Sequence, residues 1–122
     1  MATIEKIIEL FTTALDQIKL YHWAVLSYPA HKALGDLHDV LSDKVDLFVE
    51  SYIGRFKKQP LPVFQVTTKA SSDVTKVVPY LESIRDSMKL VGKNLQRESQ
   101  LLNIIDEMVT EIDKTLYLLN LH

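Results

Sequence analysis

Four segments of the chain carry apolar residues at the spacing of an amphipathic helix, and this pattern restricts the fold more than any other feature. A helix with one apolar stripe must bury that stripe against another element. Only three glycines and four prolines occur in 122 residues, which argues against a turn-rich β architecture. We therefore expect an all-α fold. The first segment runs from Thr3 to about Tyr28, with a stripe of Ile4, Ile8, Phe11, Leu15, Ile18, His22 and Val25.

The second predicted helix begins near Pro29. The residue before a proline avoids the α region, whereas proline itself fits the first helical turn. The helix is expected to end at Gly54, and Arg55, Lys57 and Lys58 then lie near its negative pole. Its apolar stripe consists of Leu34, Leu37, Leu41, Val45, Phe48 and Tyr52.

The stretch from Lys57 to Ser72, "KKQPLPVFQVTTKASS", has two prolines, several β-branched residues and no helical period. It is predicted to be a long irregular connection. Sixteen extended residues reach roughly 50 Å, whereas a helix of about 25 residues is only roughly 37 Å long. The connection can therefore traverse a whole helical bundle.

Two further helices follow this connection. The sequence "SSD" supplies good capping residues for the third helix, which has Pro79 in its early turns. Gly92 and Asn94 mark a break before the fourth helix. The third stripe is Val74, Val78, Leu81, Ile84, Met88 and Val91, and the fourth is Leu101, Ile105, Met108, Ile112, Leu116 and Leu119.

Four helices with a single long link favour one domain over residues 1–122, a four-helix bundle with a crossover between the second and third helices. Ferritin-like folds have this connectivity, and a simple up-and-down bundle is the alternative. The chain has no cysteine, which fits a reducing compartment such as the cytoplasm. Its net charge of −2, without a terminal basic cluster, argues against nucleic acid as a partner. Charged residues in the first helix argue against a signal peptide or membrane span, so we expect a soluble protein.

Residues 21–52, "YHWAVLSYPAHKALGDLHDVLSDKVDLFVESY", contain three of the four histidines. The pair His22-Trp23 in the first helix, His31 early in the second, and Asp46 with Glu50 four residues later resemble the Dps branch of the ferritin-like superfamily. The closing "SQLLNIIDEMVTEIDKTLYLLN" is similar in composition to the last Dps helix.

The resemblance implies that His22, His31, Asp46 and Glu50 are ligands of an iron-oxidising site. In that family each site is shared between two subunits, and the subunits assemble into a hollow dodecamer. The implied activity is oxidation of ferrous iron by peroxide or oxygen, for iron detoxification or storage. Two features depart from the family pattern: the spacing from His22 to His31 is shorter, and Gly35 stands where a further aspartate ligand is expected. The alternative ligands nearby are Asp36, His38 and Asp39.

Helical geometry also argues for a shared site. His31 and Glu50 are nineteen residues apart, roughly 28 Å along a helix, whereas ligand bonds are about 2 Å long. One chain cannot join them, but two antiparallel copies of the second helix across a two-fold axis can. Histidine with carboxylates suits iron, and zinc and manganese accept similar ligands. The chain has no Glu-x-x-His pair, which argues against a di-iron site inside one bundle.

The same residues also have a structural interpretation. His22 lies on an apolar stripe, where a packed histidine is common, and Trp23 could anchor a core or an interface. The carboxylates of the second helix fall on one side, as on a solvated face. The alternative function is therefore a ferritin-like bundle without a working metal site, which acts as a structural or protein-interaction module. The acidic residues in question are Asp36, Asp39, Asp43, Asp46 and Glu50.

Overall fold

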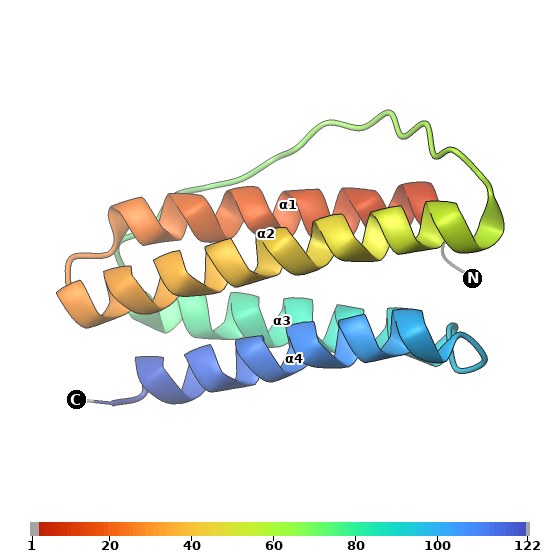
Figure 1. Ribbon diagram of the computed structural model, residues 1–122. Helices are drawn as coiled ribbons and strands as arrows, with labels where there is room; N and C mark the ends of the chain where they lie inside the picture. The colour runs from red at the N-terminus through yellow and green to blue at the C-terminus, as the bar shows by residue number, and fades with distance from the viewer. Residues whose placement is uncertain (1–2, 122) are drawn as a thin grey trace.

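The computed structural model describes residues 3–121, which form four helices and no strand. Figure 1 shows that the first and fourth helices run in one direction and the second and third in the other. The expected all-α, four-helix architecture is confirmed. None of the described helices is long and apolar enough to cross a bilayer. The helices are α1 (Ile4–Ala24), α2 (Tyr28–Phe56), α3 (Val74–Lys93) and α4 (Ser99–Leu119).

The helices pack around one apolar core. α2 contacts both α1 and α4, and α4 also contacts α3, whereas α1 and α3 share fewer contacts. Phe11 and Phe48 are completely buried and meet edge to face, with ring centroids 5.4 Å apart. Tyr21 and Tyr80 form a second edge-to-face pair between α1 and α3. Burial raises the pKa of Tyr80 to about 12, because its hydroxyl has left water without gaining a partner among the described residues.

The core face of α1 differs from the predicted stripe. Ile7, Ala14 and Tyr21 are buried, whereas Ile8 and Leu15 are only half-buried. The predicted stripe and the buried residues share Ile4, Phe11, Ile18 and Val25, and they diverge where the sequence allowed a step of either three or four residues. His22, the polar member of the predicted stripe, is half-buried, and its ring packs against Gly35 of α2.

The ends of α1 and α2 differ from the prediction, whereas the start of α3 agrees with it. α1 ends at Ala24 rather than near Tyr28, and α2 continues past Gly54 to Phe56. The predicted cap of the third helix is correct. Asp73 Oδ1 accepts hydrogen bonds from the Thr75 hydroxyl at 2.6 Å and from its backbone N–H at 2.9 Å. These two hydrogen bonds lower the pKa of the Asp73 carboxyl.

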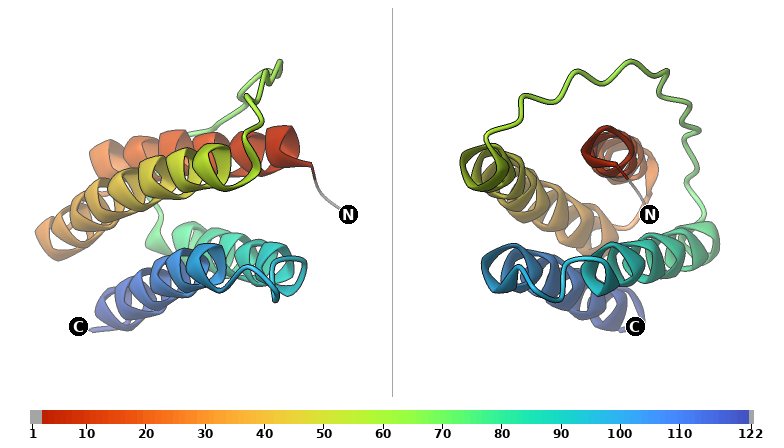
Figure 2. Two further views of the ribbon diagram at one scale, coloured as in Figure 1. Left: turned by 45° about the vertical axis from the view of Figure 1, so that its right-hand side comes forward. Right: turned by 90° about the vertical axis from the view of Figure 1, so that its right-hand side faces the viewer.

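The crossover, residues 57–73, runs along the outside of α1 from the end of α2 to the start of α3 (Figures 1 and 2). A side chain of α1 holds it through hydrogen bonds. The buried Gln17 amide donates a hydrogen bond to the carbonyl oxygen of Lys69 at 2.8 Å and accepts one from the Lys69 N–H at 2.9 Å. No backbone hydrogen bond is found within residues 58–72 of the described chain. Gln17 therefore holds the part of the crossover near α3 against α1, while Pro60, near its other end, is buried.

Replacing Gln17 with alanine is expected to release the crossover, because the Lys69 backbone loses both hydrogen bonds. We expect faster tryptic cleavage after Lys69 and a loss of about 1–2 kcal/mol in the free energy of unfolding. Limited proteolysis and urea denaturation measure the two effects. The matched control is Asp16→Ala, a change at the exposed neighbouring residue. Equal cleavage rates for the two variants would contradict the assigned role.

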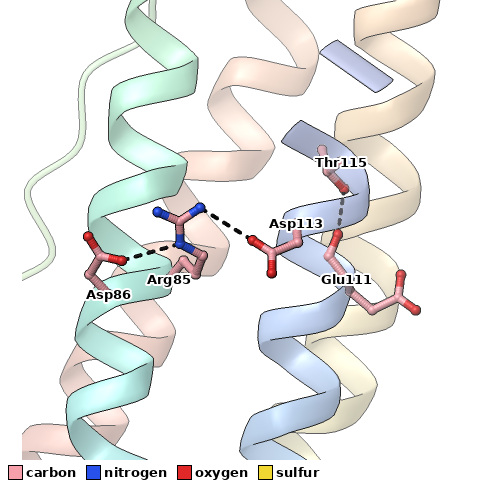
Figure 3. A network of polar contacts seen from close by, with 5 residues as sticks. All are labelled: Arg85, Asp86, Glu111, Asp113 and Thr115. Atoms are coloured by element: carbon pink, nitrogen blue, oxygen red, sulfur yellow. Dashed lines mark hydrogen bonds and ion pairs between the residues drawn. The ribbon is translucent and has the colours of Figure 1, made fainter. Parts of the chain in front are cut away.

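α3 and α4 are joined by a polar network on their outer surface (Figure 3). The guanidinium of Arg85 lies 3.2 Å from Asp86 on the same helix and 3.3 Å from Asp113 on α4. The hydrogen bond with Asp86, followed by that with Asp113, raises the pKa of Arg85. Nearby, the buried Thr115 hydroxyl donates to the carbonyl oxygen of Glu111 at 2.9 Å, so this polar group is satisfied.

Candidate functional site

The turn between α1 and α2 brings the two predicted histidine ligands together. Val25 ends α1 in an extended conformation, and the Ser27 hydroxyl caps α2 by accepting a hydrogen bond from the Ala30 N–H. Only residues 25–27 separate the two helices. This short link holds the last turn of α1 against the first turn of α2, so that His22 and His31 face each other.

The two imidazoles form a reciprocal pair, which we call the histidine clasp. His22 Nδ1 lies 2.6 Å from the carbonyl oxygen of His31, and His31 Nδ1 lies 2.8 Å from that of His22. The rings stack with centroids 4.0 Å apart and planes 18° apart. A carbonyl oxygen can only accept, so each Nδ1 must carry the hydrogen. In the neutral rings both Nε2 atoms are therefore unprotonated, which is the state that binds a metal ion.

Gly35 makes room for this clasp. A Cβ atom at Gly35 would lie 2.7 Å from His22 Cε1 and 2.9 Å from His22 Nδ1, closer than side-chain carbons approach other atoms. The sequence alone suggested that Gly35 marks a missing aspartate ligand. In the structure its hydrogen side chain instead lets the His22 ring pack on α2. A glycine inside a long helix, where it weakens the helix, was the signal for such a close approach.

A shallow cavity of about 240 Å³ lies beside the clasp. Asp36 and Asp39, two of the alternative ligands, are exposed on its rim. Asp36 pairs with Lys32 Nζ at 3.3 Å, and Asp39 Oδ1 lies 3.3 Å from His38 Nδ1. The other lining residues are Lys19, His22, Tyr28, His31, Lys32 and Gly35. These two carboxylates are exposed and already lie beside a basic side chain, and ion pairs of exposed groups contribute little to stability.

The predicted carboxylate ligands lie far from the clasp within one chain. Asp46 and Glu50 are exposed on the continuous helix α2, fifteen and nineteen residues after His31. These separations correspond to roughly 22 Å and 28 Å along the helix axis. Among residues 3–121 no group of three or more histidine, cysteine or acidic side chains is arranged to hold a metal ion. The described residues of one chain therefore do not bring His31 together with Asp46 or Glu50.

Exposed apolar side chains surround the clasp. Trp23, Leu26 and Tyr28 have exposed fractions of 65%, 89% and 70%, respectively. The Trp23 ring lies under the ammonium group of Lys19, 5.6 Å from its centroid. The Tyr28 ring lies 6.2 Å from that of His31. The candidate site thus lies on a part of the surface with exposed apolar area that a second protein molecule could cover.

Comparison with known proteins identifies a family for this chain. No curated protein and no solved structure matches the chain significantly. A protein-family profile does match it, over residues 22–119. This range includes His22 in the last turn of α1, the link between α1 and α2, and the helices α2 to α4. This match covers most of the chain. The chain therefore belongs to DUF5856, a family of unknown function.

Proposed function

We propose that the chain is a Dps-like miniferritin, which binds and oxidises ferrous iron at sites shared between two copies. The observation that supports this most directly is the histidine clasp, because backbone carbonyls hold both Nδ1 atoms and leave both Nε2 atoms without a hydrogen bond to another described residue, so that they could bind a metal. The path of the crossover and the parallel direction of α2 and α3 favour a ferritin-like bundle. The absence of cysteine favours the cytoplasm as its location.

The stacked rings suit two ions better than one. Imidazole binds a metal in the plane of its ring, at about 2 Å from nitrogen. Rings 4.0 Å apart and nearly parallel do not direct both lone pairs at the same point. Each of His22 and His31 would therefore ligate its own ion. Asp46 and Glu50 of a second copy would supply the negative charge that neither imidazole provides.

An antiparallel pair of α2 helices would bring these groups together. The midpoint between His31 and Glu50 falls between Val40 and Leu41. A two-fold axis there places Glu50 of one copy opposite His31 of the other, and Asp39 of one near Asp43 of the other. The central carboxylates then repel each other. Cations bound at the shared sites would reduce this repulsion, so that assembly and metal binding should favour each other.

The proposed reaction needs only metal ligands from the protein. Two ferrous ions each give up one electron, and one hydrogen peroxide molecule accepts both electrons with two protons to form two water molecules. Oxygen can act as oxidant in the same way, with peroxide as its product. The carboxylates of Asp46 and Glu50 would stabilise the higher charge of the ferric product, because anionic oxygen ligands favour it. Zinc or manganese could occupy the same ligands without this reaction.

A second candidate function follows from the same contacts. The imidazoles of the histidine clasp already stack on each other and donate to backbone carbonyls, which is enough to explain them as a structural link between α1 and α2. The chain would then be a structural or protein-interaction module without a metal site. Trp23, Leu26 and Tyr28 would provide its contact surface.

His31→Ala is expected to lower the initial rate of ferrous iron oxidation by about tenfold or more, because one ligand is lost. Glu50→Gln should have a similar effect. Glu82→Gln, at an exposed residue of α3, is the matched control and should retain the wild-type rate. Absorbance of the ferric product measures the rate, and elemental analysis of the purified protein measures bound metal. A metal-free, inactive wild type would support the structural module instead.

Mixing the two inactive variants tests whether the site is shared. When His31→Ala and Glu50→Gln chains are refolded together, each mixed dimer has one site with both changes and one site with neither. Random pairing then restores about a quarter of the wild-type rate. A site built from one chain would remain inactive in every mixture. Light scattering of the same samples gives the size of the assembly, and a persistent monomer would exclude the proposal.

A further inference from the structure

A second cavity lies at the end of the bundle opposite the histidine clasp. It has a volume of about 520 Å³ and opens between the start of α1, the end of α2 and the turn that joins α3 to α4. The right-hand view of Figure 2 faces this end. Its apolar lining comes from three segments that are distant in sequence, the start of α1, the end of α2 and the stretch from the end of α3 into the following turn: Ile7, Tyr52, Phe56, Val91 and Leu95. Its size is within the range of small-molecule sites.

The polar side of this cavity is basic. Lys93 and Arg97 line it, and neither forms an ion pair with another described residue. Glu98 is the acidic residue in the described lining, and Arg55 neutralises it through two hydrogen bonds of 3.1 Å. The cavity therefore has an uncompensated positive charge, although the chain as a whole has a net charge of −2.

An apolar interior beside two cations is complementary to a ligand with an alkyl chain and an anionic end. We infer that this cavity binds free fatty-acid anions. The alkyl chain would lie against Ile7, Tyr52 and Leu95, where its burial supplies most of the affinity. The carboxylate would lie near Lys93 and Arg97 at the solvent-exposed side, where its charge remains partly hydrated.

A cavity of similar size at the other end of the bundle shows what the charge adds. It has a volume of about 510 Å³ and is lined by apolar and uncharged residues of α2, α3 and α4, including Pro29, Val74, Val78 and Leu118. An alkyl chain alone could enter either cavity. Among the described residues, no lysine or arginine lines the cavity beside Pro29 and Leu118. A fatty-acid anion should therefore select the basic end.

Isothermal titration with decanoate tests this inference, with decanol as the uncharged probe of equal chain length. Decanoate should bind more tightly than decanol, and more tightly than octanoate by about fourfold per added methylene. Exchanging both cations, Lys93→Gln with Arg97→Gln, should weaken decanoate binding by roughly threefold to tenfold and leave decanol unchanged. Lys76→Gln, at an exposed lysine near the start of α3, is the matched control and should have no effect.

Two further readouts locate the bound anion. Amide chemical shifts should change around Leu95 and Tyr52, while the fluorescence of Trp23, the single tryptophan, should stay constant because it lies at the opposite end. Equal affinity for decanoate and decanol in the wild type would overturn the inference, even if the double variant failed to fold. So would shifts centred on Leu118, or binding to phosphatidylglycerol vesicles without binding to free decanoate.

Discussion

Gly35→Ala is expected to destabilise the wild-type chain but to stabilise a chain that already carries His22→Ala. In the wild type the new methyl group would lie 2.7 Å from His22 Cε1. The ring cannot move away without giving up its hydrogen bond to the His31 carbonyl. We expect a loss of about 1–3 kcal/mol in the free energy of unfolding, as for other overpacked sites.

Removing the His22 ring reverses the sign of this effect. In the His22→Ala background the methyl group meets no imidazole, and alanine is favoured over glycine inside a helix by about 1 kcal/mol. Urea denaturation of the four proteins gives the coupling energy between the two positions. The same sign in both backgrounds would show that Gly35 does not serve to accommodate His22. A decrease in iron oxidation by Gly35→Ala alone would further connect the clasp to the proposed activity.

Phe48→Ala is expected to destabilise the bundle strongly. Phe48 is completely buried on α2, where it meets Phe11 of α1 edge to face at 5.4 Å. α2 is also the helix that contacts both α1 and α4, so a cavity at Phe48 weakens the packing that joins the two halves of the bundle. The expected loss is about 3–5 kcal/mol, against a total stability of about 5–15 kcal/mol for a domain of this kind.

The adjacent residue provides the control for Phe48. Leu47 has an exposed fraction of 48%, and Leu47→Ala should cost less than about 1 kcal/mol. Urea denaturation followed by circular dichroism measures both changes. If Phe48→Ala does not fold, Phe48→Leu keeps the comparison possible, because it removes less volume. Similar losses for Leu47 and Phe48 would contradict the packing described for α2.

The helices were predictable from sequence because their signals are local. Apolar spacing located all four, and Asp73 caps α3 through side-chain geometry that acts within three residues. The face of α1 was less certain, since steps of three or four residues through Ile8 or Ile7 both preserve a helical stripe. Which step faces the core depends on where α2 and α3 lie, and this information is not local.

The candidate site was predictable in composition but not in geometry. A family resemblance selected His22 and His31, yet the reciprocal hydrogen bonds and the close approach at Gly35 depend on the angle between α1 and α2. The cavity lined by Lys93 and Arg97 was not predicted at all, because its walls come from three segments that are far apart in the sequence. The attachment of the crossover by Gln17 was hidden for the same reason: a buried glutamine in a helix does not reveal a partner 52 residues away.

The positions of the four helices do not depend on the length of the crossover, the longest loop of the chain. α1 with α2, and α3 with α4, are two helical hairpins that meet mainly where α2 packs on α4. Between Lys57 and the attachment at Lys69, the loop makes no backbone hydrogen bond that positions a helix. Residues could thus be inserted or lost around Val63, which is 99% exposed, while both hairpins keep their places. A chain with a longer segment at this position should therefore keep the contact between His22 and His31 at the turn between α1 and α2.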